Sequence, residues 1–297
     1  MRWEGEREST NVEDRRGGGG GTGGFGVPLG RGGIGLGTIV IALVGGWLLG
    51  INPLTLLGIL AGGPMDSAPS PSPAPHAQHR PAPDDRAERF SAVVLASTED
   101  VWSAEFARRG ARYEPPVLVI YDGRTHTACG AGSAASGPFY CPADRKVYLD
   151  LGFFRVMREQ LGAGGEFAQA YVIAHEVGHH LQNLAGTSAK IQSARERMNE
   201  RQFNALSVRV ELQADCYAGV WAKLSEQAKG WLDRGDVQQA IDSAASVGDD
   251  RLQKRAQGVA VPDSFTHGSS EQRTRWFRTG LDSGRLQDCD TFSARAP

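Results

Sequence analysis

Two histidines and a glutamate in the stretch 174–180 have the types and the spacing of a metal site for hydrolysis. His175 and His179 are four residues apart, and in a helix such positions lie one above the other, so both imidazoles can bind one cation. Glu176 lies beside them, off the ligand axis, where it can act as a general base on a metal-bound water. This is the H-E-x-x-H pattern, and it predicts a zinc site. The alternative is two buried structural histidines and an exposed glutamate.

A helix over residues 166–184 is the element that must position these side chains. Apolar residues recur there at steps of three and four, which is typical of a helix: Phe167, Tyr171, Ala174, Gly178 and Leu181. Gly186 follows as a stop signal. We therefore expect both histidines on one face of one helix.

The third zinc ligand must come from another element, because a hydrolytic zinc has three protein ligands and an open position for water. The best candidate is Glu211, in the run 208–221, which is apolar on nearly every face and predicts a buried helix. Asp215 follows on the same face. Buried carboxylates are rare unless they are paired or bind metal, so we expect Glu211 to bind zinc and Asp215 to hold the far nitrogen of a ligand histidine. The alternative is an acidic pair on a solvent-exposed face.

These motifs resemble a known group of enzymes. H-E-x-x-H followed by a second helix with E-x-x-A-D at 211–215 is similar to the gluzincin metallopeptidases. The resemblance is strongest to the membrane-associated gluzincins. Residues 1–5 and the stretches 11–20, 147–151 and 267–273 resemble the bacterial neutral zinc metallopeptidase family. The resemblance covers nearly the whole chain except a Pro-rich segment. It implies a zincin-like catalytic domain on a membrane anchor, with one Zn²⁺ per chain.

Composition divides the 297-residue chain into four parts. Residues 1–33 are polar and then Gly-rich, which predicts a flexible cytoplasmic tail. Residues 34–60 predict a transmembrane anchor, because Ile34–Gly50 carries no charge. Residues 61–83 form a Pro-rich linker, and residues 84–297 are long enough for one metallopeptidase domain. The net charge of -2 gives no reason to expect nucleic acid as a partner.

Arginines are distributed unevenly around the predicted anchor. Those that precede it are Arg2, Arg7, Arg15, Arg16 and Arg31, and no Lys or Arg follows until Arg80. By the positive-inside rule this predicts a single-pass protein of the bacterial cytoplasmic membrane, with a cytoplasmic N-terminus and a periplasmic or extracellular catalytic domain. A cleaved signal peptide is the alternative, although its positive region would be unusually long.

The domain itself predicts an α+β fold, mostly helical with a small β-sheet. Helical patterns cover 86–96, 98–109 and 153–161, strands are expected at Val117–Tyr121 and 146–151, and further helices begin near Asp236 and after Ser269. In zincin-like folds an edge strand above the metal helix pairs with the extended substrate backbone. Residues 146–150 are the candidate for that strand. An ordinary structural strand is the alternative.

His267, just before the last predicted helix, is the candidate oxyanion donor. Thermolysin-like enzymes have a His or Tyr that donates to the tetrahedral oxyanion. The resemblance extends this role to His267, whereas a lone loop histidine can equally be structural or exposed.

Four cysteines in an exported domain suggest two disulfides, for which three pairings are possible. Cys129 with Cys141 would close a short loop, and Cys216 with Cys289 would tie the second metal helix to the C-terminal tail. A cysteine zinc site is not expected, because the chain has no C-x-x-C pair. In the reversed orientation all four would be reduced thiols.

The expected function is a membrane-anchored zinc metalloendopeptidase acting on a polypeptide substrate, with Glu176 activating the zinc-bound water. An inactive metal-binding scaffold is one alternative, which the intact Glu176 disfavours because a structural site needs no base. A zinc hydrolase of a non-protein amide, such as one in cell-wall material, is the other.

Overall fold

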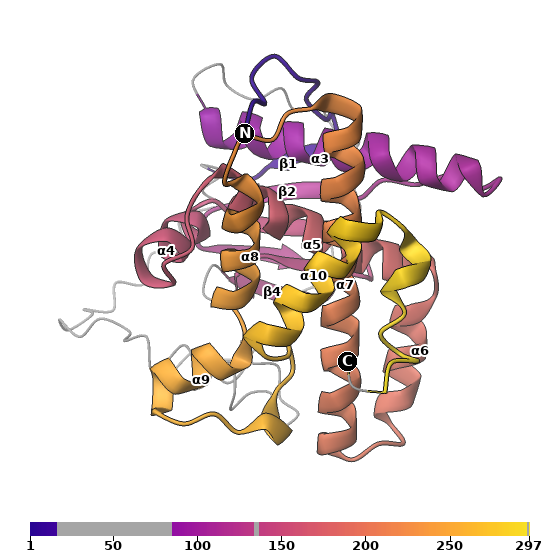
Figure 1. The fold of residues 1–297 in the computed structure, drawn as a ribbon, viewed down its shortest axis with the longest axis vertical. Coiled ribbons are helices and arrows are strands. Elements are labelled where there is room, and N and C mark those ends of the chain that lie inside the picture. Colours follow the sequence, from indigo (N-terminus) through magenta and orange to yellow (C-terminus); the bar gives the residue numbers. More distant parts are fainter. Residues whose placement is uncertain (17–84, 134–136, 296) are drawn as a thin grey trace, which may run out of the picture.

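The computed structural model describes residues 1–16, 85–133, 137–295 and 297, and this part is a mostly helical α+β fold with a small sheet, as predicted (Figure 1). The predicted anchor at 34–60 and the Pro-rich linker lie outside the described residues. Among the described residues, no helix has both the length and the apolar character that a membrane span requires.

Four strands form the main sheet, in the order β1-β2-β6-β5. Their bounds are β1 Val12–Asp14, β2 Val117–Tyr121, β5 Phe139–Cys141 and β6 Lys146–Asp150. β1, β2 and β6 are parallel, and β5 is antiparallel to β6. β2 reads as a continuous apolar run because both faces of this central strand are covered. A separate hairpin pairs β3 (Arg124–Thr127) with β4 (Gly130–Ser133).

The prediction that 146–150 is the edge strand is wrong. β6 pairs with β2 on one side and with β5 on the other, so it is an interior strand. β5 lies at the edge, in a stretch for which the sequence pattern predicts no strand. Phe139 of this short strand stacks on Tyr148 of β6, with ring centroids 5.0 Å apart, and the disulfide at Cys141 ties its end to Cys129. These tertiary contacts, and not an alternation of polar and apolar residues, hold β5 in the sheet.

The helices surround the sheet and one another. Their bounds are α3 Arg86–Arg108, α4 Gly152–Gln160, α5 Glu166–Leu184, α6 Thr187–Arg195, α7 Glu200–Lys229, α8 Asp236–Ser246, α9 Asp249–Gln257 and α10 Ser270–Ser283, with short 3-10 turns η2 Pro262–Ser264 and η3 Leu286–Cys289. α5 has the predicted bounds. The two helices predicted over 86–109 are one continuous helix, because the Thr98 hydroxyl donates to the Leu95 carbonyl inside the helix (2.7 Å) and caps no second one.

The core joins the sheet to the motif helix. One face of β2 and β6 packs into the helical core through Leu118, Ile120, Val147 and Leu149. α5 contacts β5 and β6 on one side and α7 on the other, and Phe167 of α5 stacks on Trp221 of α7 with centroids 5.9 Å apart. The residues predicted to bind metal are therefore held on two helices that pack directly together.

Residues 1–16 belong to this folded domain, which corrects the predicted flexible tail for this part of the chain. Trp3 is buried and packs edge-on against Phe90 of α3, with centroids 5.3 Å apart. Val12–Asp14 adds a parallel strand beside β2, and Arg16 forms ion pairs with Asp14 and with carboxylates at the start of α3. The sequence prediction rested on the absence of periodicity, whereas burial of an aromatic ring and paired charges order this segment.

This packing bears on the predicted single-pass topology. A single crossing within 34–60 would leave residues 1–16 and residues 85–297 on opposite sides of a membrane. The parallel pairing of β1 with β2 unites both in one domain, so a cytoplasmic N-terminus combined with an exported domain does not fit the described fold.

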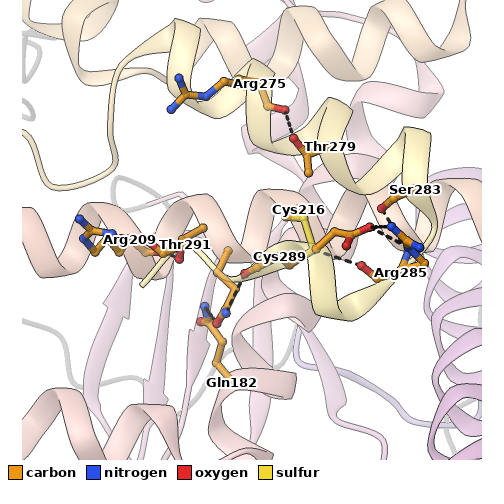
Figure 2. The surroundings of a disulfide bond; sticks show 11 residues. Gln182, Arg209, Cys216, Arg275, Thr279, Ser283, Arg285, Cys289 and Thr291 are labelled. Atoms are coloured by element: carbon orange, nitrogen blue, oxygen red, sulfur yellow. Dashed lines mark hydrogen bonds and ion pairs between the residues drawn. A yellow bond between two sulfur atoms is a disulfide. The ribbon is translucent and has the colours of Figure 1, made fainter. Parts of the chain in front are cut away.

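The four cysteines form two disulfides, as expected, and the structure selects one of the three possible pairings. Cys129 is bonded to Cys141 and Cys216 to Cys289. The first joins the turn between β3 and β4 to the last residue of β5. The second fastens η3 near the C-terminus to α7 (Figure 2).

Candidate metal centre

His175, His179 and Glu211 converge on one point between α5 and α7. The two imidazoles are nearly perpendicular, with centroids 4.8 Å apart. Nε2 of His175 lies 3.2 Å from Glu211 Oε2, and Nε2 of His179 lies 3.4 Å from Glu211 Oε1. Of the described residues, these three form the group whose ligand atoms all lie within 4.8 Å of one another. The predicted first and second helices thus bring their candidate ligands together.

The donor atoms fit a zinc ion. Tetrahedral zinc with bonds of about 2.0 to 2.1 Å keeps neighbouring donor atoms about 3.3 to 3.4 Å apart, close to the separations from Glu211 to the two histidines. Two imidazole nitrogens and one carboxylate are also the donor set of hydrolytic zinc sites, which leave one position open. Close packing of α5 on α7 makes the convergence possible, because a Cβ on Gly178 would lie 3.0 Å from the Ala214 Cα.

Asp215 is oriented toward the far nitrogen of His175, as predicted. It is fully buried, and its Oδ1 accepts from His175 Nδ1 (2.8 Å). Arg273 of α10 donates to both carboxylate oxygens (2.8 and 2.9 Å), and the Tyr171 hydroxyl donates to Oδ1 as well. Burial opposes ionisation, but Arg273 and His175 outweigh it and lower the pKa of Asp215. His175 therefore faces a carboxylate held as an anion by a buried cation.

The charges around the candidate ligands are strongly coupled. Burial alone would raise the pKa of Glu211, but the two histidines hold it well below its ordinary value. Burial likewise opposes a charge on His175, and the Asp215 carboxylate raises the pKa of that imidazole to about 10 in the absence of a cation. A cation that binds here replaces protons on the histidines, so metal binding is coupled to proton release.

Glu176 lies on α5 next to His175 and is buried. Burial raises its pKa, although positive charge on His179 and His175 acts in the opposite direction. A buried carboxylate with a raised pKa, close to a site for a cation, is suited to accept and return a proton.

Half of the His267 side chain is exposed, and the imidazole pairs with Asp249. Its Nδ1 is 3.2 Å from Asp249 Oδ1, and the backbone N–H groups of Thr266, His267 and Gly268 donate to Asp249 Oδ2 (2.7, 2.7 and 3.1 Å). Desolvation of the enclosed half of the ring lowers the pKa of His267, but Asp249 and then Glu211 outweigh it and raise that pKa. The imidazole is therefore fixed by one carboxylate and lies within electrostatic range of the candidate metal ligand.

His180, which follows the motif, is directed elsewhere. Its Nδ1 lies 3.0 Å from the Tyr140 hydroxyl and its Nε2 2.7 Å from the Glu114 carbonyl oxygen. Burial lowers its pKa to about 4. It is a neutral, hydrogen-bonded histidine that joins α5 to β5.

Sequence reasoning missed four residues of the site: Arg273, Tyr171, Gln182 and Asp249. Tyr171 precedes His175 by one helical turn, so this spacing could have identified it as a hydrogen-bond donor. Gln182 follows His179 by three residues on the same helix, so spacing could have indicated it too. Arg273 and Asp249 act across the fold, so spacing along the chain carries no information about them.

Two helix-spaced histidines with a buried glutamate beside them, completed by a carboxylate from a second helix, define a zinc-metallopeptidase type of site in a mostly helical α+β domain. Comparison with known proteins agrees with this class. The model of the family described as "Putative neutral zinc metallopeptidase" matches residues 1–292, and the chain belongs to this family.

Relatives occur in distant bacteria. The chain is 48% identical over 297 residues to "Uncharacterized protein YpfJ" of Escherichia coli K12, covering 98% of this chain and 99% of that protein. It is 39% identical over 258 residues to "Uncharacterized protein Rv2575" of Mycobacterium tuberculosis H37Rv, covering 83% and 85% of the two chains. No solved structure matches this chain.

Proposed function

We propose that this protein is a zinc-dependent metalloendopeptidase. The observation that carries the proposal is the convergence of His175, His179 and Glu211, with the buried Glu176 next to the first histidine. A structural metal site needs no such base, and a scaffold would gain nothing from a buried carboxylate that costs free energy to ionise.

Each side chain has a defined part in the reaction. His175, His179 and Glu211 hold the zinc ion, which when bound supplies Lewis-acid chemistry by acidifying a water and polarising a carbonyl. Glu176 takes the proton of the attacking water and returns it to the leaving amine. His267 donates a hydrogen bond to the oxyanion that develops. Desolvation lowers the pKa of His267, but Asp249 outweighs it and raises this pKa, which supports the protonated donor form.

An extended polypeptide is the substrate class, bound along β5. This antiparallel strand ends the sheet order β1-β2-β6-β5, and its outer edge pairs with no strand of the described residues. It contacts the motif helix through Tyr140 and His180, with ring centroids 5.4 Å apart. An edge strand next to the metal helix can accept a peptide backbone by strand addition.

The proposal includes a location. The domain, together with residues 1–16, lies on the oxidising side of the bacterial cytoplasmic membrane, where disulfides persist. Two disulfides that account for all four cysteines support this. The apolar stretch 34–60 is the segment expected to attach the protein to that membrane.

The test compares the full-length protein with its Glu176→Gln variant. Both should contain about one zinc per chain by elemental analysis, while cleavage of unfolded casein, followed by mass spectrometry of the peptides, should be lost in the variant. Purified cell-wall fragments form a second substrate arm. Cleavage of wall fragments while casein stays intact would indicate an amidase in place of a peptidase. A zinc-loaded wild type that cleaves neither substrate would indicate a binding protein.

A further inference from the structure

The far nitrogen of His179 contacts an amide. Its Nδ1 lies 2.9 Å from Gln182 Oε1, one turn further along α5. Gln182 is buried, and its Nε2 donates to the Val210 carbonyl (2.7 Å) and to Gln213 Oε1 (3.1 Å), both on α7. Gln213 Nε2 in turn donates to the Cys289 carbonyl in η3 (3.0 Å). A continuous chain of hydrogen bonds thus runs from His179 to the C-terminal segment.

The direction of this chain is fixed by its backbone partners. A carbonyl only accepts, so Gln213 must turn its NH₂ group to Cys289, and Gln182 must turn its NH₂ group to Val210. Each carbonyl oxygen then faces the opposite way, and the Gln182 oxygen faces His179. An oxygen requires a donor, so His179 carries its proton on Nδ1. The lone pair of a neutral His179 is then on Nε2, which points toward Glu211.

The end of the chain is fastened to the helix that carries Glu211. Arg209, Gln213 and Cys216 follow one another along one face of α7 at steps of four and three, and all three hold the segment 289–291. The Arg209 guanidinium donates to the Thr291 carbonyl, and the Arg209 backbone carbonyl accepts from the Thr291 hydroxyl. Cys216 is bonded to Cys289. Figure 2 shows Gln182, Arg209 and Thr291 gathered around this disulfide. The Cys289 acceptor is therefore held in place relative to the metal site.

The two histidines thus have chemically different partners. His175 faces Asp215, an anion paired with buried Arg273. His179 faces a neutral amide whose own groups are all hydrogen-bonded. A neutral acceptor can fix the tautomer of an imidazole without adding a second negative charge behind the site.

We propose that Gln182 and Gln213 are positioning residues: this amide relay, ending on the disulfide-held Cys289 carbonyl, keeps His179 in the Nδ1–H tautomer with Nε2 ready for zinc. The inference rests on the proposed metal site. Partners behind a metal-binding histidine typically change metal affinity about 10- to 100-fold. Gln182→Leu keeps the size of the side chain and removes the acceptor, so it should weaken zinc binding by about this factor. Gln213→Leu should also weaken zinc binding, but by a smaller factor.

The test uses the full-length protein and two measurements. The zinc dissociation constant is obtained by competition with a chromophoric chelator. ¹⁵N NMR of the metal-free protein, recorded at a pH above the raised pKa of His179 so that this imidazole is neutral, reports which of its two nitrogens carries the proton. We expect the Nδ1–H form in the wild type and a shift toward the Nε2–H form in Gln182→Leu. If Gln182→Leu does not fold, Gln213→Leu, one step further from the histidine, takes its place.

Gln253 provides the matched control. It is buried to a similar degree and hydrogen-bonded through both ends of its amide, to Ser264 Oγ (3.0 Å) and to the Val261 N–H (2.8 Å), away from the relay. Gln253→Leu should lower stability but leave zinc affinity unchanged. Equal zinc affinities for Gln182→Leu and Gln253→Leu, or a wild-type His179 protonated on Nε2, would overturn the relay. Neither readout depends on peptidase activity, so an inactive protein would refute the proposed function without touching this inference.

Discussion

At the scale of single residues, the two carboxylates on α7 have different partners although they are one helical turn apart. Glu211 faces Nε2 of both histidines, whereas Asp215 faces Nδ1 of His175 and the guanidinium of Arg273. The first is therefore a candidate ligand and the second orients a ligand. Two carboxylates of one helix have different roles here because Asp215 also faces Arg273 of α10.

This difference gives the first prediction. Glu211→Ala opens the coordination sphere, so both zinc and proteolysis should be lost. Asp215→Asn keeps one acceptor for His175 but removes the charge that pairs with Arg273, so zinc should still bind at saturating metal with an affinity about 10- to 100-fold lower. A zinc titration of both variants beside a casein assay measures this. Loss of zinc in Asp215→Asn with retention in Glu211→Ala would exchange the two roles.

Asp249 and His267 give a prediction in pH. Burial opposes the charge on Asp249, but His267 and backbone donors lower its pKa below the ordinary 3.8, so its stabilising effect is present above about pH 4 and lost as pH falls further. The pKa of His267 is raised above 6.5 despite burial, so its share is full below about pH 6.5 and lost as pH rises through the raised value. Asp249→Asn should therefore lower the free energy of unfolding most between these limits.

Urea unfolding of the wild type and Asp249→Asn at about pH 3, 5.5 and 9 measures the effect. His267→Gln serves as the partner control and should remove the decline at high pH. A destabilisation by Asp249→Asn that is the same at all three pH values would show that the charge of the pair contributes nothing.

The residues that could be predicted are those whose geometry is local. His175, Glu176 and His179 share one helix, so their spacing alone gives their relative positions. Glu211 was also predictable, because a carboxylate in an apolar helix needs a partner. Arg273 was not, since its role depends on the packing of α10 against α7, which no periodicity in the sequence encodes.

At the scale of elements, the site depends on how closely three helices approach. α10 crosses α7 in Figure 1, and a Cβ on Gly280 of α10 would overlap the carbonyl oxygen of Cys216 on α7. This backbone contact brings Arg273 within reach of Asp215. The same contact lies beside the disulfide that fastens η3 to α7.

Gly280→Ala should therefore destabilise the protein by about 1 to 3 kcal/mol, because the helices must separate to admit the methyl group. Zinc affinity should fall with it, since Arg273 moves away from Asp215. Thermal unfolding and chelator competition report the two effects. Gly164→Ala is the control, because its Cβ would meet only the flexible Arg158 side chain, 3.1 Å away at Cγ. Equal unfolding temperatures for the two variants would contradict the close-contact explanation.

Among the elements, those with a clear apolar pattern, such as α5 and β2, were predictable, and β5 was not. α5 was predicted with its full bounds because nineteen residues carry the apolar repeat. β5 has three residues and takes its place from the stacking of Phe139 on Tyr148 and from a disulfide. Without that strand, β6 could be taken for the sheet edge. Contacts between distant residues, which a linear pattern omits, account for this error.

At the scale of the whole molecule, residues 1–16 and the described residues from 85 onward form one body. Beyond the pairing of β1 with β2, the Arg7 guanidinium donates to Glu99 of α3 (3.0 Å), and the Ser9 backbone N–H donates to the Ala92 carbonyl (3.0 Å). Any membrane topology must leave both segments on one side.

Cysteine labelling tests this. The native cysteines are all in disulfides, so an impermeant maleimide should react only at an introduced exposed thiol, Thr10→Cys or Lys254→Cys. We expect both positions to be labelled in intact spheroplasts, because disulfides indicate an oxidising compartment. Labelling of one position and protection of the other until lysis would refute the shared side. Protection of both would keep the shared side and reverse the compartment.

The N-terminal strand also limits the order in which the parts of the domain can fold. β1 leaves the ribosome well before β2 (Val117–Tyr121), and the Arg2 backbone N–H donates to the carbonyl of Trp231, far later in the chain (2.7 Å). Contacts of such sequence separation close slowly. The earliest residues made are thus among the last to dock, and until then β2 keeps an unpaired apolar edge open to other chains. Synthesis and transport must deliver both ends of the chain to one compartment before the sheet can close.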